Sequence, residues 1–355
     1  MPQKQLLIIS PGFAAHEADY NCIPPLQMLI QAFLTENITV QVITLEYPYT
    51  QSEFSWHSAQ VSPMGGRNSI WRKPLTLWKA YQTAVTWVYK NKNAECAVLS
   101  CWLGWASFVG ERLASRFQLR HFTLLMGQDV LPANGWRLKR LRQERFQRLI
   151  AVSAFQNQVL QEQTGHLAGH VIPWGIQGLP TAGNSGRSPL ILGVGSLISL
   201  KNWEKWLQTL AHFLPGHPDY QAILIGDGPE KARLEQRCRA LQLEHSVRLI
   251  GSLPRPEVIA YMQQASVLLH TSEYESYGFV LAEAMACGAQ VVSTPTGIAT
   301  ELGITTGKTP EQLAMALGSV LIKPVVANTL PNVQSMVQAY ITRLFPPEIT
   351  PSPPI

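Results

Sequence analysis

Short apolar runs alternate with amphipathic stretches along most of this chain. A run of four to eight apolar residues is typical of a strand buried on both faces, and apolar residues spaced three and four apart are typical of a helix. Strands are expected at LLIIS (6–10), ITVQVITLEY (38–47), AVLSCWLG (97–104), HFTLLMGQD (121–129), LIAVSAF (149–155) and HVIPWGI (170–176). Helices are expected at about 26–34, 75–89 and 106–115, and an irregular segment at 47–63. Strands that alternate with helices predict βαβ units and a parallel sheet.

The alternation is interrupted once, in the middle of the chain. The stretch QGLPTAGNSGRSP (177–189) is dense in Gly, Pro, Ser and Asn, which is typical of a linker between domains. Beyond it, strands are expected at LILGVGSL (190–197), AILIGDGP (222–229), VRLIGSL (247–253), VLLH (267–270) and QVVS (290–293), with helices at about 203–213, 230–241, 255–264, 279–286 and 332–345. We therefore predict an α/β protein with two domains, 1–176 and 177–330, each a doubly wound parallel sheet.

Composition narrows the class of protein. Apolar residues make up 46% of the 355 residues and charged residues 14%, which fits a globular α/β protein better than a disordered one. No apolar run reaches the roughly 18 residues of a membrane span, and the N-terminus lacks the pattern of a signal peptide. Five scattered cysteines without CxxC spacing argue for a reducing compartment and against a structural zinc site. We expect a cytoplasmic protein.

The segment Thr271 to Glu301 is the richest in candidate chemistry. Ligands of open α/β sheets bind beyond the carboxyl ends of the strands, so the polar loop 272–278 is a place to expect one. Glu275 in this loop and Glu283 in the following helix suggest that the ligand carries hydroxyl groups. General acid and base catalysis, or a solvated helix face, are the other interpretations of the two carboxylates. Backbone amides of residues 276–279 lie at the helix start, where they favour phosphate or sugar oxygens.

Two glycine-rich turns follow strands of the second domain. The turn GVGSL lacks the third glycine of a dinucleotide fingerprint, so a nicotinamide cofactor is not expected. A tight strand-to-helix turn and a diphosphate cradle are both open interpretations of Gly195 and Ser196. Lys201 lies at the opening of the next helix, where the amides and the helix dipole favour an anion. A second turn, with Gly226 and Gly228, precedes the following helix.

The stretch Arg67 to Lys92 combines six basic residues with three tryptophans and two tyrosines, and it has no acidic residue. No nucleic-acid-binding motif accompanies it, so a nucleic-acid partner is not expected. A solvated helix is one explanation of the stretch. A surface that contacts an anionic membrane is the other, because tryptophan, arginine and lysine together suit lipid headgroups.

Five segments together resemble the retaining GT-B glycosyltransferases of family 4, the glycosyl transferases group 1. ESYGFVLAEAMACG (275–288) is similar to their E-x7-E segment, VGSLISLKN (194–202) to GRLxxxKG and IGDGP (225–229) to their GxGP turn. VIPWGI (171–176) is similar to their IPNGI hinge, and VSAF (152–155) to the end of their first domain. The resemblance implies two Rossmann-like domains facing a cleft, with a terminal helix at about 331–346 that crosses back onto the first domain.

The resemblance also assigns the donor, a nucleotide-diphosphate sugar linked to UDP or GDP, mostly to the second domain. Glu283 would hold the ribose hydroxyls, and Glu275 would contact hydroxyls of the transferred sugar. Lys201 would neutralise the diphosphate as the glycosidic bond breaks, which is an electrostatic role. Backbone amides at the helix start would bind donor oxygens; their residues are Ser276, Tyr277, Gly278 and Phe279.

Two residues of the first domain complete the predicted site. Gly12 would approach the phosphates. Asp129, at the end of the strand 121–129, is a candidate for contacting the acceptor or for acting as a helper base, with a turn or cap aspartate as the alternative. In such enzymes the leaving phosphate is thought to take the acceptor's proton. Neither a metal nor a separate cofactor is therefore expected, and the chain has no DxD motif on a loop.

Several positions depart from the family pattern. Ser196 stands where an arginine is common, which removes one of two phosphate cations, and Trp174 replaces the usual asparagine of the hinge. Cys101 lies about where many relatives carry an acceptor-side histidine, and the segment after Glu301 is shortened. We expect unusual phosphate binding with retained activity.

The leading prediction is a retaining, metal-independent glycosyltransferase that moves a sugar to a glycan or lipid-linked acceptor, in synthesis of a cell-surface or exported polysaccharide. Peripheral contact of Arg67 to Lys92 with the inner face of the membrane would bring a lipid-linked acceptor to it. Two alternatives remain open. One is a GT-B sugar-nucleotide epimerase, which would turn over without an acceptor, and the other is a degenerate GT-B module that binds a nucleotide or a partner protein.

Overall fold

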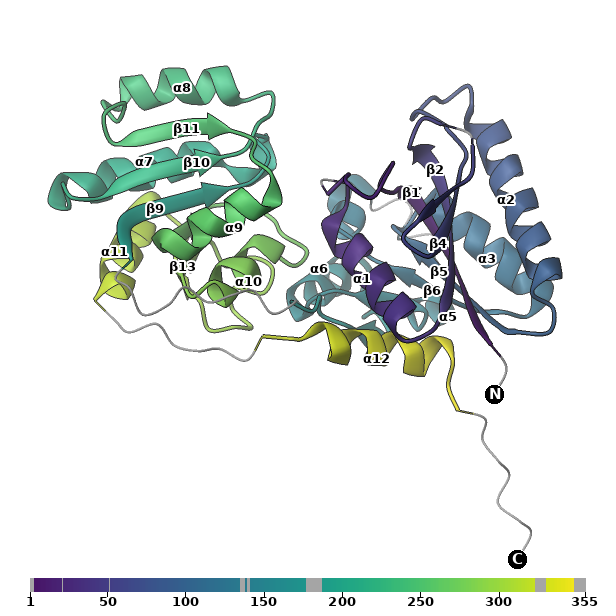
Figure 1. Cartoon of the computed structure of the whole chain (residues 1–355). Coiled ribbons are helices and arrows are strands. Elements are labelled where there is room, and N and C mark those ends of the chain that lie inside the picture. Colours follow the sequence, from purple (N-terminus) through teal and green to yellow (C-terminus); the bar gives the residue numbers. More distant parts are fainter. Residues whose placement is uncertain are drawn as a thin grey trace, which may run out of the picture. The chain divides into compact units, whose positions relative to one another are not determined.

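The computed structural model describes residues 3–20, 22–50, 52–134, 138, 141–176, 187–322 and 330–347 of the chain. The chain divides into two units, whose elements are labelled in Figure 1. The first unit comprises 1–152, 157–175 and 333–355, and the second comprises 153–156 and 176–332. The chain thus passes through the second unit and returns to the first for its last helix. Of the predicted linker 177–189, only 187–189 are among the described residues.

The first unit is built on an eight-stranded sheet of order β3-β4-β2-β1-β5-β6-β7-β8, in which all neighbours are parallel except β3 and β4. The strands are β1 (Lys4–Gly12), β2 (Thr39–Tyr47), β3 (Phe54–Trp56), β4 (Ala59–Pro63), β5 (Glu95–Cys101), β6 (Arg120–Leu124), β7 (Leu149–Ala151) and β8 (His170–Val171). Residues 6–9 of the central strand β1 are fully buried. A continuous apolar run, rather than an alternating one, is what a parallel strand with helices on both faces requires.

Helices cover both faces of this sheet. They are α1 (Pro24–Thr35), α2 (Lys73–Lys90), α3 (Trp105–Phe117), α5 (Gln143–Phe146), α6 (Ala154–Thr164) and α12 (Val333–Leu344). On one face, α2 and α3 pack on Leu7 and Ile9 of β1. The intervening residues of β1 point to the other face. There α1 and α12 pack together, with the rings of Phe33 and Tyr340 edge-to-face at 6.0 Å between centroids.

Part of the predicted irregular stretch 47–63 forms strands instead. The short strands β3 and β4 make an antiparallel pair, and β4 extends the sheet beside β2. Trp56 of β3 is buried and packs edge-to-face on Phe13, with 4.9 Å between ring centroids. The prediction of an irregular segment is wrong because the pairing strand and the packing partner both come from distant parts of the sequence.

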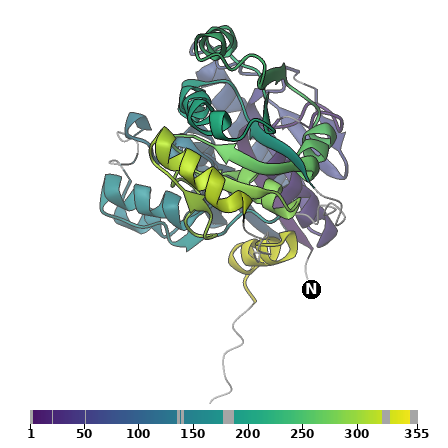
Figure 2. The same cartoon turned by 90° about the vertical axis from the view of Figure 1, so that its left-hand side faces the viewer.

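The second unit has a six-stranded, parallel sheet of order β11-β10-β9-β12-β13-β14. The strands are β9 (Ser188–Val194), β10 (Gln221–Ile225), β11 (Val247–Gly251), β12 (Ala265–His270), β13 (Gln290–Ser293) and β14 (Thr305–Thr306). The helices are α7 (Trp203–Phe213), α8 (Lys231–Ala240), α9 (Arg255–Gln264), α10 (Phe279–Ala286) and α11 (Pro310–Leu321). Figure 2 looks onto this unit, with the yellow-green α11 beside the teal α7.

The main core of the second unit lies between its sheet and the layer of α7, α8 and α11, while α9 and α10 pack together on the opposite face. Trp203 and Trp206 of α7 are fully buried in this core. The indole of Trp206 lies so close to Gly193 that a Cβ there would be 2.9 Å from the ring. Gly193 therefore lets α7 pack directly on the end of β9, which fixes the position of the loop that follows.

The predicted α/β class, with two doubly wound parallel-sheet units, is confirmed. Within the described residues, no helix combines the length and hydropathy that a membrane-spanning segment needs.

Candidate functional site

The carboxyl ends of β9 and β10 carry two glycine turns that contact each other. The amide of Gly195 donates to the end of β10 (3.0 Å), and Leu197 N donates to Asp227 O (2.9 Å). Gly226 has a φ of 153°, and a Cβ on it would lie 1.9 Å from the carbonyl oxygen of Gly195. A Cβ on Gly228 would lie 2.5 Å from the carbonyl oxygen of Leu197. Because glycine permits these approaches, the two turns form one backbone floor at the edge of the sheet.

Lys201 is held at this edge by the turn that precedes α7. Asn202 adopts a left-handed conformation (φ 47°), and its side chain caps α7. Thr271, just beyond β12, donates to the carbonyl of Lys201 (3.2 Å). The Lys201 ammonium forms an ion pair with Glu275, which is 74 residues away in the sequence. The loop after β9 and the loop after β12 are thereby joined through both backbone and side-chain contacts.

Glu275 is the centre of a polar network at the ends of β12 and β13. Its Oε1 lies 3.0 Å from His270 Nε2 and 2.9 Å from Ser272 Oγ, and it is also the atom that pairs with Lys201. His270 ends β12, is 2% exposed, and has its Nδ1 3.1 Å from Ser293 Oγ. Burial by itself raises the pKa of Glu275, but the hydrogen bond from His270 and the charge of Lys201 outweigh it and lower that pKa to about 2. The carboxylate is therefore ionised at neutral pH.

Glu283 belongs to a separate ion pair. Gly278, with a φ of 86°, precedes α10, and Glu283 lies in the middle of that helix. Arg255, at the start of α9, donates from Nε (3.0 Å) and Nη2 (2.7 Å) to Oε1 of Glu283. The Glu283 side chain is only 12% exposed. Burial raises the pKa of Glu283, and the charge of Arg255 opposes that rise.

The start of α10 is fixed by the loop that follows β13. Ile298 N donates to the carbonyl of Tyr277 (2.8 Å). Gly297 has a φ of 57°, and a Cβ on it would lie 2.2 Å from the same carbonyl oxygen. Ser153 donates from its hydroxyl to the carbonyl of Ser276. The loop that carries Glu275 is thus held from two sides within the second unit.

Four predicted residues come together at one edge of the second sheet: Gly195, Ser196, Lys201 and Glu275. Glu283 is not part of this group, because it lies on α10 and forms its ion pair with Arg255 of α9. Ser196 is exposed there, and its carbonyl accepts from the indole of Trp203 (2.9 Å).

His270 and Arg255 are not predicted from the sequence as site residues. A signal for His270 exists, because it ends the apolar strand VLLH at the same edge as the loop of Glu275. In the sequence, Arg255 is the first residue of an expected helix and nothing indicates a role at a site. Its ion pair with Glu283 depends on the packing of α9 against α10.

Asp129 of the first unit lies in a short 3-10 helix, Gln128–Val130. Its Oδ1 accepts from Leu103 N (2.8 Å), and its Oδ2 accepts from Met126 N (2.8 Å) and Gly127 N (3.0 Å). The residue is 4% exposed, and burial raises its pKa although the amides oppose the rise. Backbone amides engage both oxygens, as in a turn aspartate, and Asp129 also lines a cavity of the first unit, so its contact with an acceptor stays a prediction.

Gly12 ends β1, and its carbonyl accepts from Ser10 Oγ (2.7 Å). A Cβ at this position would lie 3.6 Å from the Cβ of Tyr47, which is an ordinary contact. The local packing therefore does not by itself require glycine, and the approach of Gly12 to a phosphate stays a prediction.

A cavity of about 570 Å³ opens at the carboxyl ends of the strands of the first unit. Glu46 of β2 and Lys73 of α2 form an ion pair at its wall. Trp102 and Trp105, beyond the end of β5, also line it. The cavity thus combines a charged pair with aromatic surface.

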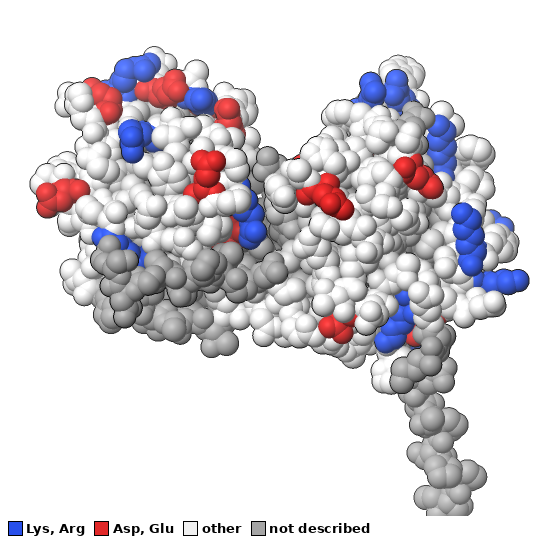
Figure 3. All heavy atoms as spheres, in the orientation of Figure 1, with Lys and Arg blue, Asp and Glu red and all other residues white. Residues whose placement is uncertain are grey.

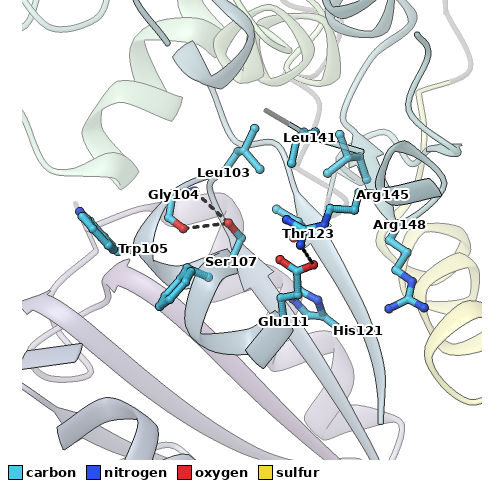
Figure 4. A pocket seen from close by; sticks show the side chains of 12 residues that line it. Leu103, Gly104, Trp105, Ser107, Glu111, His121, Thr123, Leu141, Arg145 and Arg148 are labelled. Carbon is cyan, nitrogen blue, oxygen red and sulfur yellow. Dashed lines mark hydrogen bonds and ion pairs between the residues drawn. The ribbon is translucent and has the colours of Figure 1, made fainter. Parts of the chain in front are cut away.

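A second cavity, of about 290 Å³, lies between α3 and α5 (Figure 4). Its lining is mostly apolar, and the ion pair between Glu111 and Arg145 (2.7 Å) stands at its side. His121, on β6, is buried against Ser100 Oγ at 2.9 Å. Burial lowers the pKa of His121 to about 3, so this imidazole is neutral.

No group of three His, Cys, Asp or Glu side chains is arranged to hold a metal ion within the parts of the chain that are described.

Residues 181–309, most of the second unit, match the family model of the glycosyl transferases group 1. This segment of the second unit is therefore similar to the glycosyl transferases group 1. The resemblance to this family is thereby confirmed for the segment that holds three of the five motifs, at 194–202, 225–229 and 275–288.

Curated relatives align over parts of this chain. The GPI3 subunit of phosphatidylinositol N-acetylglucosaminyltransferase from Saccharomyces cerevisiae is 29% identical over 122 residues, which is 33% of this chain and 27% of the relative. D-inositol 3-phosphate glycosyltransferase from Corynebacterium jeikeium is 31% identical over 150 residues, which is 38% of this chain and 36% of the relative. The matches therefore span about a quarter to a third of the relatives' length.

Solved structures match nearly the whole chain. HepE from Anabaena in complex with UDP and glucose has a TM-score of 0.67 at 18% identity and covers 96% of this chain and 97% of its own. Sucrose-phosphate synthase from Thermosynechococcus elongatus has a TM-score of 0.66 at 20% identity and covers 95% and 94%. At this level of identity the likeness concerns the fold, and the predicted GT-B fold is confirmed.

Proposed function

We propose that the chain is a retaining glycosyltransferase that uses a nucleotide-diphosphate sugar, and that its second unit binds this donor. The observation that carries the proposal is the network of Lys201, Glu275 and His270 on a glycine-built backbone floor. A cation, an ionised carboxylate and close-packed glycine turns at the ends of parallel strands suit a ligand that carries both phosphates and hydroxyls. The similar HepE structure holds UDP and glucose, which supports the same ligand class here.

Lys201 supplies the charge for the diphosphate. Its side chain is 21% exposed and that of Glu275 is 15% exposed, so the ion pair reaches the surface of the unit. When the donor binds, Lys201 shares its charge between Glu275 and the diphosphate and stabilises the charge that develops as the glycosidic bond breaks. With no arginine at Ser196, this lysine carries more of that role than in relatives that have both cations.

Glu275 holds the transferred sugar. Among the described residues, its polar contacts all fall on Oε1. The second oxygen, Oε2, is therefore the one that accepts hydrogen bonds from sugar hydroxyls. His270 and Ser272 fix the orientation of the carboxylate, which keeps that acceptor in place.

Glu283 binds the ribose hydroxyls, and Arg255 favours the ionised form of Glu283 that accepts their hydrogen bonds. Burial favours the protonated form of Glu283, and the two hydrogen bonds from Arg255 favour the ionised form. An ionised carboxylate accepts hydrogen bonds from both ribose hydroxyls. The backbone at residues 276–279 contributes amide groups to donor oxygens, and the turns at 195–196 and 226–228, whose glycine amides donate within the unit, let the donor approach the backbone closely.

The sugar is transferred with retained configuration and without a metal ion. The leaving phosphate takes the proton of the acceptor hydroxyl, the bond from the anomeric carbon to that phosphate breaks, and a bond to the acceptor oxygen forms on the same face. The cavity of about 570 Å³ in the first unit suits a glycan or lipid-linked acceptor, because aromatic surface packs on sugar rings and the Glu46–Lys73 pair binds hydroxyls. A cell-surface or exported polysaccharide is the product class that we propose, with the protein peripheral on a membrane.

A donor screen tests this proposal. The protein is incubated with UDP- and GDP-linked sugars and with a lipid extract as acceptor, release of UDP or GDP is followed, and NMR of the product reports the anomeric configuration. Activity that persists in EDTA is expected, and inversion of configuration would contradict the mechanism. Turnover without acceptor would indicate an epimerase. Nucleotide binding without turnover would indicate a degenerate binding module.

A further inference from the structure

The residues just before α2 and the outward face of its first two turns carry large apolar side chains. Trp71 is 94% exposed and Ile70, just before the helix, is 83% exposed. Leu75 and Trp78 follow at helical spacing and are 55% and 60% exposed. A helix that packs on a sheet normally turns polar residues outward. We name the surface formed by Ile70, Trp71, Leu75 and Trp78 the α2 apolar surface.

The α2 apolar surface is the main part of the predicted contact stretch, Arg67 to Lys92, that the structure leaves exposed. Trp87, in the last turns of α2, is 6% exposed and belongs to the core with Ala80 and Ala84. Tyr81 is half-buried against the guanidinium groups that α3 presents. Tyr89, near the end of α2, is 60% exposed, and the other exposed aromatic and aliphatic side chains of the stretch lie at and just before the start of the helix. A patch of this kind marks a contact with a membrane or a partner.

Charge around the α2 apolar surface decides between these partners. Arg67 and Arg72 are exposed, Lys79 is half-buried, and no acidic residue occurs between Arg67 and Lys92. Glu53, which lines a cavity together with Trp78 and Lys79, is a carboxylate beside this surface, so the three cationic side chains outnumber it. Lys73 is neutralised by Glu46, so it adds nothing to the surface charge. In Figure 3, Lys and Arg side chains follow one another along the face of the first unit over α2.

We propose that the α2 apolar surface docks on a lipid bilayer that contains anionic headgroups. Tryptophan and leucine side chains enter the boundary between headgroups and acyl chains, and the surrounding arginine and lysine side chains contact the phosphates. This proposal is independent of the glycosyltransferase function. Docking nevertheless bears on the proposed acceptor site, because Asn68 and Lys73, next to this surface, line the cavity of about 570 Å³. Docking would hold that cavity at the lipid surface.

Flotation of the full chain with vesicles tests the proposal. Vesicles of phosphatidylcholine alone are compared with vesicles in which about a third of the lipid is phosphatidylglycerol. The wild-type chain is expected to float with the anionic vesicles and to be released as salt is raised toward about 0.5 M. The double variant W71S/W78S is expected to bind about tenfold more weakly or worse. R72Q and K79Q are each expected to weaken binding to anionic vesicles about fivefold and to leave binding to neutral vesicles unchanged.

A matched control is available on the second unit. Met315 and Ile322 are 68% and 85% exposed, and M315S/I322S removes similar exposed apolar surface from α11 and the residue after it. This variant is expected to float like the wild type, and all variants are expected to keep the wild-type melting temperature. Failure of the wild-type chain to bind anionic vesicles, or equal binding by W71S/W78S, overturns the proposal. A change of oligomeric state in W71S/W78S by light scattering, without a change in flotation, would show that this surface binds protein instead.

Discussion

Replacement of Glu275 by glutamine probes the centre of the proposed donor site. Glutamine keeps the size of the side chain and one oxygen for His270 and Ser272, but it removes the charge that pairs with Lys201. The pKa of Glu275 lies at about 2, compared with an ordinary value of 4.5. Because each tenfold change in proton affinity is worth about 1.4 kcal/mol, the network stabilises the ionised state by roughly 3 kcal/mol.

This contribution depends on pH with a definite sign. A carboxyl group whose pKa is lowered on folding stabilises the protein above its unfolded-state pKa, and that stability is lost as the pH falls toward the folded-state pKa. For Glu275 the window runs from 4.5 down to about 2. The wild-type chain is expected to lose roughly 3 kcal/mol more than E275Q across this window, because glutamine does not titrate. At neutral pH, E275Q is expected to be the less stable protein, since Lys201 is left half-buried without its counter-charge.

Urea unfolding of both proteins at a series of pH values measures the difference. Hydrogen exchange of the amides in β12 and β13 shows whether the second unit is the part that responds. The variant E257Q removes an exposed carboxylate from the same unit and is the control for loss of one charge. If the stability difference between the wild type and E275Q is the same at about pH 3 and about pH 7, the network does not hold Glu275 ionised and the reasoning is refuted.

Three further predictions concern the same unit. K201A is expected to lower turnover about a hundredfold or more, because the charge that stabilises the leaving diphosphate is lost; steady-state kinetics with the donor found in the screen measure this. R255M is expected to raise the pKa of Glu283 further, so that calorimetry shows weaker nucleotide binding at about pH 6 than at about pH 8, with a larger difference than in the wild type. G226A is expected to lower the melting temperature by several degrees, because its Cβ would lie 1.9 Å from the carbonyl oxygen of Gly195.

Each of these variants has a control and an outcome that contradicts it. K308A removes an exposed lysine of the same unit, and unchanged turnover in K201A would show that Lys201 is wrongly assigned. Nucleotide binding by R255M with the pH dependence of the wild type would show that Arg255 does not govern Glu283. At Gly216 an added Cβ would meet nothing within 4 Å, so G216A is expected to melt like the wild type. Equal melting of G226A and G216A would refute the close contact of the two turns.

Local patterns predicted most elements of the fold and the loops that carry the residues of the proposed site. The run Leu6 to Ile9 predicted a central parallel strand, because burial on both faces demands apolar residues at consecutive positions. The spacing of Glu275 and Glu283 within one loop–helix segment also predicted how each lies relative to α10. Where pairing comes from distant residues, prediction failed. The strand β4 pairs with β2, and Trp56 of β3 packs on Phe13. The residues 54–63 themselves do not indicate either contact.

The stretch Arg67 to Lys92, which contains α2 and the turn before it, also separates what the sequence predicts from what packing decides. From composition alone, Trp71 and Trp87 are equally good candidates for contact with a membrane, because both lie among basic residues. Packing separates them, since Trp87 faces the sheet and Trp71 faces water. Asp129 is a related case. The sequence places it at the end of a strand, whereas in the structure β6 ends at Leu124 and three backbone amides bind the Asp129 carboxylate.

The sequence by itself therefore determined the class of the fold, most of the order of its elements, and the loops in which we propose a donor site. These properties depend on the periodicity of apolar residues and on backbone preferences, which act over a few positions. Tertiary structure alone decided the ion pairs: Lys201 with Glu275 across 74 residues, and Arg255 with Glu283 across 28. The physical reason is that an unpaired charge becomes unfavourable only when folding removes it from water. Which opposite charge then lies close enough to pair with it depends on how the helices and strands pack.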